Sequence, residues 1–180
     1  IPKRDWSSDV CSSDLRPRST TDPAAGAGGC GGAAPPHAAG VDLREKLEDL
    51  RGELDPFADA HERHSHLVDR ARRAPRLGPA ERTDANRVPG CISVVWLDGV
   101  AVADGCTFRA HADSPVVHGL LALLCDFFSG VPAAEVAACE LDPLAELGIS
   151  RGLSPTRVNG LASARARIRA IARAAAGPAC

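Results

Sequence analysis

Cys91 is the residue best placed to do chemistry in this sequence. It follows Val88-Pro89-Gly90, where Pro-Gly predicts a tight turn with the glycine at positive φ. It precedes Ile92-Ser93-Val94-Val95-Trp96-Leu97, a β-branched and aromatic run typical of a strand. A thiol at the tip of such a turn is free to approach a partner, and positive charge such as that of Arg82 and Arg87 lowers a thiol pKa. The alternative is a small buried hydrophobic residue, which is the commoner fate of a free cysteine.

The other cysteines indicate the redox environment of the protein and do not suggest a second functional site. The chain has seven, an odd number with no C-x-x-C pair, at positions 11, 30, 91, 106, 125, 139 and 180. This pattern argues against a disulfide framework and predicts a reducing, cytoplasmic setting. Cys106, Cys125 and Cys139 lie among apolar sequence neighbours, so we expect them to fill the core.

Histidines offer a second kind of chemistry. His61, His64 and His66 are close in sequence, but on a helix His66 points away from the face that the other two share. Because no second ligand cluster has zinc-like spacing, we expect a solvated face with one partly packed histidine and no metal. His111 and His118 flank a predicted helix start, which leaves open a hydrolase that pairs one of them with a cysteine nucleophile.

The composition is that of a globular domain with an appendage. A length of 180 residues, with 44% hydrophobic and 24% charged residues, suits one domain, and a net charge of −2 gives no electrostatic footprint for nucleic acid. The longest apolar run, Val116–Cys125, is shorter than the roughly 18–20 residues that a membrane helix needs. Residues 1–20 resemble a translated adapter sequence, residues 21–40 an Ala/Gly/Pro linker, and residues 41–175 are the predicted domain.

Four helix starts are predicted by a capping residue followed by proline: Asp55-Pro56, Ser114-Pro115, Asp142-Pro143 and Ser154-Pro155. Apolar periodicity predicts helices over residues 43–54, 57–74, 114–128, 132–139, 142–147 and 155–175. The helix over 114–128 is apolar nearly all round, which places it in the centre of the core. The last helix carries arginines that we interpret as a solvated face: Arg165, Arg167, Arg169 and Arg173.

Two strands are predicted between the second and third helices. They cover residues 92–97 and 106–111, and in the second strand Cys106, Phe108 and Ala110 alternate with polar residues. Asp98-Gly99 and Asp104-Gly105 are both hairpin-type dipeptides, of which we favour the latter as the turn. Two helices, a small antiparallel sheet and a helical C-terminal half make an α+β fold in two layers.

Three blocks of sequence resemble the SufE family, in the right order and over roughly residues 42–173. Asn86-Arg87-Val88-Pro89-Gly90-Cys91-Ile92-Ser93-Val94-Val95-Trp96 resembles the signature around the family's sulfur-accepting cysteine. Residues 113–120 with 128–130 resemble its central helix. Leu153-Ser154-Pro155-Thr156-Arg157-Val158-Asn159-Gly160-Leu161 is similar to its Leu-Ser-Pro-Ser-Arg-x-Asn-Gly-Leu block. Three ordered blocks are more specific than any single motif.

The resemblance implies a SufE/IscU-like fold and a carrier function for Cys91. It implies that Cys91 takes persulfide sulfur from a SufS-type cysteine desulfurase, whose cofactor is pyridoxal phosphate, and passes it to a SufB-containing scaffold that assembles iron–sulfur clusters. The protein is then an accessory that stimulates the desulfurase, not an enzyme, with no cofactor of its own and acting as a monomer or weak homodimer. The family's cysteine loop can tuck its sulfur into an apolar cavity, which Trp96 and the helix over 116–124 are candidates to line.

Several positions depart from the family's pattern, among them His64 and His66, where the second helix usually has aromatic residues. Ile92 and Val94 stand where the family usually has glutamine, His111 replaces the first acid of an Asp-Ser-Asp run, and His118 stands where Arg or Lys is usual. These changes indicate a divergent member whose desulfurase contacts differ, and they leave the cysteine loop intact.

Two further alternatives remain beside the hydrolase. An iron–sulfur scaffold of the IscU kind needs three well-placed cysteines and a further ligand, and we expect Cys106 and Cys139 to be too embedded to join Cys91. An interaction module in which Cys91 is inert predicts that this thiol reacts no faster than a buried one.

Overall fold

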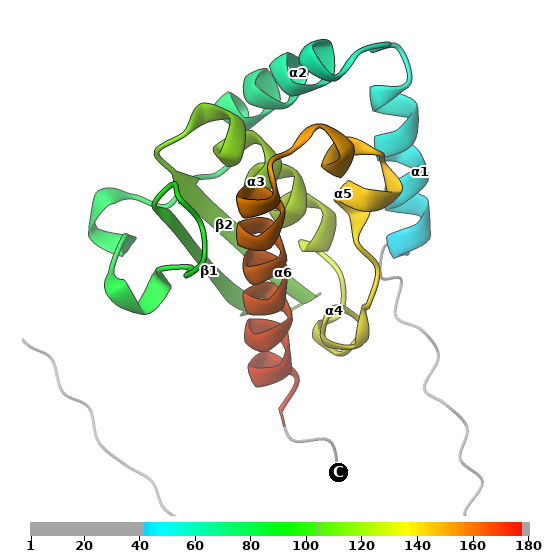
Figure 1. Ribbon diagram of the computed structural model, residues 1–180. Helices are drawn as coiled ribbons and strands as arrows, with labels where there is room; N and C mark the ends of the chain where they lie inside the picture. The colour runs from blue at the N-terminus through cyan, green and yellow to red at the C-terminus, as the bar shows by residue number, and fades with distance from the viewer. Residues whose placement is uncertain (1–41, 104, 178–180) are drawn as a thin grey trace, which may run out of the picture. The chain divides into compact units, whose positions relative to one another are not determined.

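The computed structural model of the protein describes residues 42–103 and 105–177. The predictions for residues 1–20 and 21–40 lie outside this part of the chain. Within it, six α-helices and one two-stranded antiparallel sheet follow one another, with three short 3₁₀ helices between them (Figure 1). Two helices, a small sheet and a helical C-terminal half form the α+β fold that the sequence predicts.

The bounds of the elements lie close to those predicted from periodicity. The α-helices are α1 (Leu43–Leu54), α2 (Ala60–Arg73), α3 (Pro115–Phe128), α4 (Ala133–Ala138), α5 (Pro143–Glu146) and α6 (Pro155–Ala176). The strands are β1 (Val95–Val102) and β2 (Gly105–Ala112), and the 3₁₀ helices are η1 (Pro79–Glu81), η2 (Asp84–Asn86) and η3 (Ile149–Gly152).

The start of α2 differs from the prediction. Asp55-Pro56 does not open this helix, because Asp55 caps the end of α1 and donates its backbone N–H to the Arg51 carbonyl. The chain then turns, and Asp59 becomes the N-cap of α2, with Oδ1 accepting from the Glu62 N–H at 2.8 Å. Ser114 and Asp142 cap α3 and α5 through their side chains, as predicted.

The hairpin closes next to the favoured dipeptide. Val102 of β1 pairs with Gly105, which opens β2, whereas Asp98-Gly99 lies inside β1 and is not the turn. Gly99 is needed there for space, because a Cβ at this position would lie 2.5 Å from Cδ1 of Phe108 on the opposite strand. The strand β1 also begins later than predicted, and residues 91–94 remain a loop.

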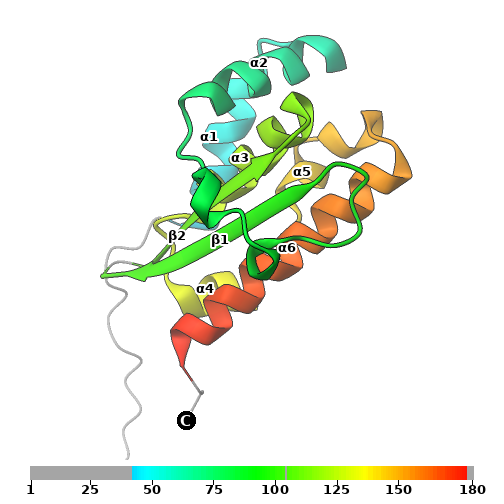
Figure 2. The ribbon, with the colours of Figure 1, turned by 90° about the vertical axis from the view of Figure 1, so that its left-hand side faces the viewer.

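One face of the hairpin is covered by the two long helices of the C-terminal half. α3 packs on β2 and α6 packs on β1, while α2 packs on α3 and α4 on α6 (Figures 1 and 2). α3 lies at the centre of the core, as its composition predicts, with eleven of its residues buried. The strand β2 alternates as predicted, and Cys106, Phe108 and Ala110 are all buried.

None of the helices that the structure describes combines the length and apolar character that crossing a membrane requires.

Candidate functional site

Cys91 lies on the loop between η2 and β1, half-buried against the core. Its neighbour is Gly160 in α6, and the approach is unusually close. A Cβ built on residue 160 would lie 2.7 Å from Sγ of Cys91 and 2.8 Å from its Cβ. Real Cβ atoms essentially never come this close to another heavy atom, so the cysteine occupies the space that a side chain at 160 would fill. The loop that carries Cys91 is therefore docked on the first turns of α6.

The residues on either side of Cys91 differ in their surroundings, because Gly90 lies close to α6 and Ile92 faces solvent. Gly90 has φ of 86°, the positive value that the Pro-Gly turn predicts, and a Cβ on it would lie 3.3 Å from Oγ of Ser163 in α6. Ile92 is 81% exposed, the highest exposure among the large hydrophobic side chains that the structure describes. The thiol is thus sheltered on its inner side by α6 and followed in the chain by an apolar side chain open to solvent.

Backbone hydrogen bonds hold the two ends of the Cys91 loop together. The Val88 N–H donates to the Val95 carbonyl at 2.9 Å, and Arg87 forms an antiparallel bridge with Trp96. The Val88 side chain is buried and anchors this closure to the core. Because the ends are fixed, residues 89–94 form a short closed loop that carries Cys91 against α6.

Arg167 fastens the same loop to α6 and was missed from the sequence. Its Nε donates to the Leu97 carbonyl at 2.7 Å, and its Nη2 donates to the Ala85 carbonyl at 2.7 Å and to Asn86 Oδ1 at 3.2 Å. One guanidinium therefore spans both sides of the loop base. A sequence signal existed: Gly160, Ser163 and Arg167 are spaced i, i+3, i+7, which places them on one face of a helix.

The interpretation of the other α6 arginines as a solvated face is wrong for two of them. Arg165 pairs with Asp142 and Arg169 with Glu140, and both arginine side chains are less than a quarter exposed. These ion pairs tie α6 to the segment between α4 and α5. Arg173 is exposed, as predicted.

The remaining described cysteines are poor nucleophiles or lie elsewhere. Cys106 and Cys125 are buried, as predicted, and burial raises the pKa of both thiols. For Cys125 burial and the charge of Asp126 raise the pKa to about 12, so its thiolate is scarcely populated at neutral pH. Cys139 is only half-buried, which departs from the core role expected for it, and it follows α4.

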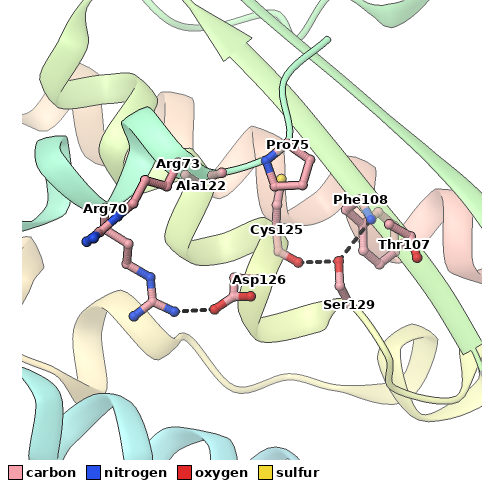
Figure 3. A pocket seen from close by; sticks show the side chains of 10 residues that line it. Arg70, Arg73, Pro75, Thr107, Phe108, Ala122, Cys125, Asp126 and Ser129 are labelled. Atoms are coloured by element: carbon pink, nitrogen blue, oxygen red, sulfur yellow. Dashed lines mark hydrogen bonds and ion pairs between the residues drawn. The ribbon is translucent and has the colours of Figure 1, made fainter.

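A pocket of about 330 Å³ opens beside Cys125, between the end of α2, β2 and the end of α3 (Figure 3). In Figure 3 Arg70 pairs with Asp126 on one side, and on the other the Ser129 hydroxyl donates to the Cys125 carbonyl at 2.6 Å and accepts from the Phe108 N–H. Neither Cys91 nor Trp96 lines this pocket. This pocket is therefore not the cavity that was predicted to receive the sulfur, and that cavity stays a prediction. In this structure the thiol lies against α6 at Gly160.

The described histidines fall into separate groups. His66 lies beside Glu53, with Nε2 and Oε1 2.8 Å apart, and its ring rests on Phe57 with centroids 4.6 Å apart. No group of three or more His, Cys, Asp or Glu residues suited to a metal occurs in residues 42–103 and 105–177. His111 and His118 lie beside each other with ring centroids 5.7 Å apart, and neither ring is hydrogen-bonded to Cys91.

These features define a small α+β protein that presents one thiol on a loop docked to its C-terminal helix. A solved structure of the same fold exists, the solution structure of a hypothetical protein from Thermus thermophilus. It is 20% identical and superposes with a TM-score of 0.61, covering 72% of this chain and 95% of that one.

Sequence relationships then identify the family. Residues 48–172 match the family described as SufE, an Fe-S metabolism associated domain, and the chain belongs to this family. An uncharacterized SufE-like protein of Rhizobium meliloti is 33% identical over 124 residues, which span 64% of this chain and 89% of that one. The sulfur acceptor protein CsdE of Escherichia coli is 34% identical over 119 residues, 63% of this chain and 79% of that one.

Proposed function

We propose that this protein is a sulfur acceptor and carrier that takes persulfide sulfur onto Cys91 from a SufS-type cysteine desulfurase. The observation that carries the proposal is the placement of Cys91: a thiol on a loop closed by hydrogen bonds, docked on Gly160, and followed by the exposed Ile92. Membership of the SufE family and similarity to a protein named a sulfur acceptor support this assignment.

The chemistry is thiol–disulfide exchange with a persulfide as the electrophile. The Cys91 thiolate attacks the outer sulfur of a persulfide on the desulfurase cysteine, a new S–S bond forms, and the old S–S bond breaks. The desulfurase cysteine leaves as a thiolate, and Cys91 is left as a persulfide. No net oxidation or reduction occurs, so the step needs neither a metal nor a cofactor on this chain.

The docked position of Cys91 suits the stage of sulfur transfer in which the persulfide is held on this chain. Against α6 the sulfur is shielded on its inner side, which limits the access of reductants and oxidants to a labile persulfide. Transfer requires the loop to lift so that Sγ can reach a sulfur on the partner. We infer that the loop moves as a unit about its closure at Val88 and Val95, whose backbone hydrogen bond holds its base.

The observed contacts disfavour the alternatives. An IscU-like scaffold needs several ligands around one metal site, and the described residues offer no such group. A hydrolase needs a thiol–imidazole hydrogen bond, and within the described residues neither His111 nor His118 makes one with Cys91. Membership of the SufE family supports an accessory role in sulfur transfer, as opposed to an enzymatic one.

The direct test combines the full chain with a SufS-type desulfurase, pyridoxal phosphate and cysteine. Intact-mass and peptide mass spectrometry should show a gain of one sulfur atom on Cys91, and sulfide release should rise above that of the desulfurase alone. The Cys91→Ser variant should show neither effect, and Cys139→Ser, which removes another half-buried thiol, should behave as wild type. Sulfide release unaffected by the protein, or equal stimulation by Cys91→Ser, would sink the proposal.

The onward steps belong to the same proposal. The persulfide on Cys91 is delivered to a SufB-containing scaffold, and the protein acts as a monomer or weak homodimer in a reducing, cytoplasmic setting. A pull-down with the scaffold complex, carried out with persulfidated and with reduced protein, tests the delivery step. Binding that does not depend on the persulfide and is unchanged in Cys91→Ser would contradict it.

A further inference from the structure

A second pocket, which we call the His118 pocket, lies where the end of α2, the end of β2 and the start of α3 meet. Its volume is about 450 Å³, and Cys91 does not line it. The lining residues that matter here are Arg72, Arg76, His111, Asp113, Pro115 and His118.

His118 is a buried polar residue that lines this pocket. It is only 5% exposed, and neither Nδ1 nor Nε2 makes a well-formed hydrogen bond in the part of the chain that the structure describes. The Ala71 carbonyl lies near the ring, but it already accepts from Nη2 of Arg76 at 3.1 Å. Nδ1 of the neighbouring His111 is also buried without a hydrogen-bond partner among the described residues. Buried polar atoms normally have a partner, since leaving them unpaired costs free energy. A ligand in the pocket that accepts hydrogen bonds would supply the missing partners.

The charges around the two rings are mainly positive. Burial, together with the charges of Arg76, His111 and Arg82, lowers the pKa of His118 to about 4, while the Ala71 carbonyl acts in the opposite direction. Burial and the charges of Arg82 and Arg76 likewise lower the pKa of His111, against the charge of Asp113. The same arginines that disfavour an imidazolium ion favour an anion in the pocket.

The start of α3 adds a further attraction for negative charge. Pro115 occupies the first position of this fourteen-residue helix and lines the pocket, so the positive end of the helix dipole faces it. Asp113, whose side chain is largely exposed, is the one acidic residue among the described residues that line the pocket, with Oδ1 3.9 Å from Nε2 of His111. Arg72 is paired with Asp69 at the surface, which leaves Arg76 as the lining cation without an acidic partner among the described ion pairs.

We propose that the His118 pocket binds a small oxoanion of the sulfate or phosphate class between Arg76 and the two histidines. The anion accepts hydrogen bonds from the guanidinium and from an N–H of each ring. Its charge offsets that of the arginines, so a histidine takes up a proton as the anion binds. Binding is therefore tighter at lower pH, by up to about tenfold per pH unit for one proton taken up. This inference does not depend on the sulfur-transfer function.

The experiment titrates the full chain with sulfate, whose charge is constant over the range used, at pH 8, 7 and 6. Sodium chloride at equal ionic strength is the reference, because it screens charge without filling the site. Calorimetry gives the dissociation constant, and histidine side-chain ¹⁵N NMR follows the two rings. We expect saturable binding that tightens as the pH falls, with resonances of His118 and His111 shifting toward the imidazolium form.

Variants separate the site from general charge effects. Arg76→Gln and His118→Gln should each weaken sulfate binding at least tenfold, and His118→Gln should also flatten its pH dependence. Arg173→Gln and His61→Gln make the same substitutions at exposed positions outside the pocket and should bind as wild type. Circular dichroism and the NMR spectrum establish that each variant is folded. Shifts no larger with sulfate than with chloride, or unchanged binding in both pocket variants, would overturn the proposal.

Discussion

Cys91 and Gly160 are separated by 69 positions in the sequence, yet the sulfur of one occupies the space that a Cβ on the other would need, 2.7 Å away. Through this contact the Cys91 loop packs on the start of α6. It also joins two of the three sequence blocks, since one carries the cysteine and the other the glycine that receives it.

Gly160→Ala should lift the Cys91 loop from α6. Alanine favours a helix over glycine by about 1 kcal/mol, but the clash with Sγ and Cβ of Cys91 costs about 1–3 kcal/mol if the loop stays. We therefore expect lower or unchanged stability together with faster alkylation of Cys91. Gly52→Ala is the matched control, because nothing lies within 4 Å of its Cβ position in α1, and it should be stabilised by up to about 1 kcal/mol. Equal behaviour of the two variants in urea denaturation and in thiol labelling would contradict the docked geometry.

Arg167→Gln should release the base of the loop. Loss of the three hydrogen bonds to residues 85, 86 and 97 should lower the free energy of unfolding by about 1–3 kcal/mol. Amide hydrogen exchange should quicken at Val88 more than in α3. Arg173→Gln removes the same charge from an exposed position on the same helix and should stay within about 0.5 kcal/mol of wild type. An Arg167→Gln variant with unaltered exchange at Val88 would show that the guanidinium does not hold the loop.

Ile92→Gln should weaken sulfur transfer without affecting stability. The side chain is 81% exposed, so the free energy of unfolding should change by less than about 0.5 kcal/mol. If the partner covers it, the loss of buried apolar area, worth about 1.5 kcal/mol or more, should raise the apparent KM for the desulfurase about tenfold. Val100→Thr changes a side chain 49% exposed on β1 and is the control. Unchanged kinetics for Ile92→Gln would place the partner elsewhere.

His118 should make the protein acid-sensitive in a defined range. Its pKa in the folded state is about 4, below the value of about 6.5 in an unfolded chain, so the unfolded state binds the proton first. Its contribution to stability is complete above about pH 6.5 and is lost as the pH falls toward 4, by about 2–3 kcal/mol in total. Chemical denaturation in chloride buffers between pH 7.5 and 4.5 should therefore show a shallower pH dependence for His118→Gln. His61→Gln should keep the wild-type slope, and an equal flattening in that variant would refute the assignment.

Much of the fold could be predicted because its signals are local. Apolar periodicity gave α1 and α3 almost to the residue, and Ser114 and Asp142 cap their helices as a side-chain acceptor before a proline predicts. The failure at Asp55-Pro56 is instructive, since Asp59 lies four residues later and competes for the same role. Two capping residues near one helix start cannot be ranked without knowing how the preceding helix ends.

The surroundings of Cys91 were predicted in part. Its Pro-Gly turn was predicted, and its role as the site residue stays a prediction, but Arg167 was assigned to solvent because it sits among other arginines in a polar stretch of helix. Its partners are two backbone carbonyls and one amide oxygen from a distant loop. Because every residue has a backbone carbonyl, the sequence does not indicate which of them accepts a hydrogen bond. The pairing of Arg165 with Asp142 was missed for a similar reason, because the two residues come from separate elements.

The sequence by itself determined the helices, the hairpin turn, the cysteine at a Pro-Gly bend and the family, because each depends on residues that are neighbours in the chain or on an ordered set of motifs. Only the tertiary structure decided that Cys91 rests on Gly160, that Arg167 holds the loop, and that His111 and His118 meet beside arginines in a shared pocket. These relationships join residues from separate elements. They follow from how α3 and α6 pack on the hairpin, which a one-dimensional pattern of apolar and polar residues does not specify.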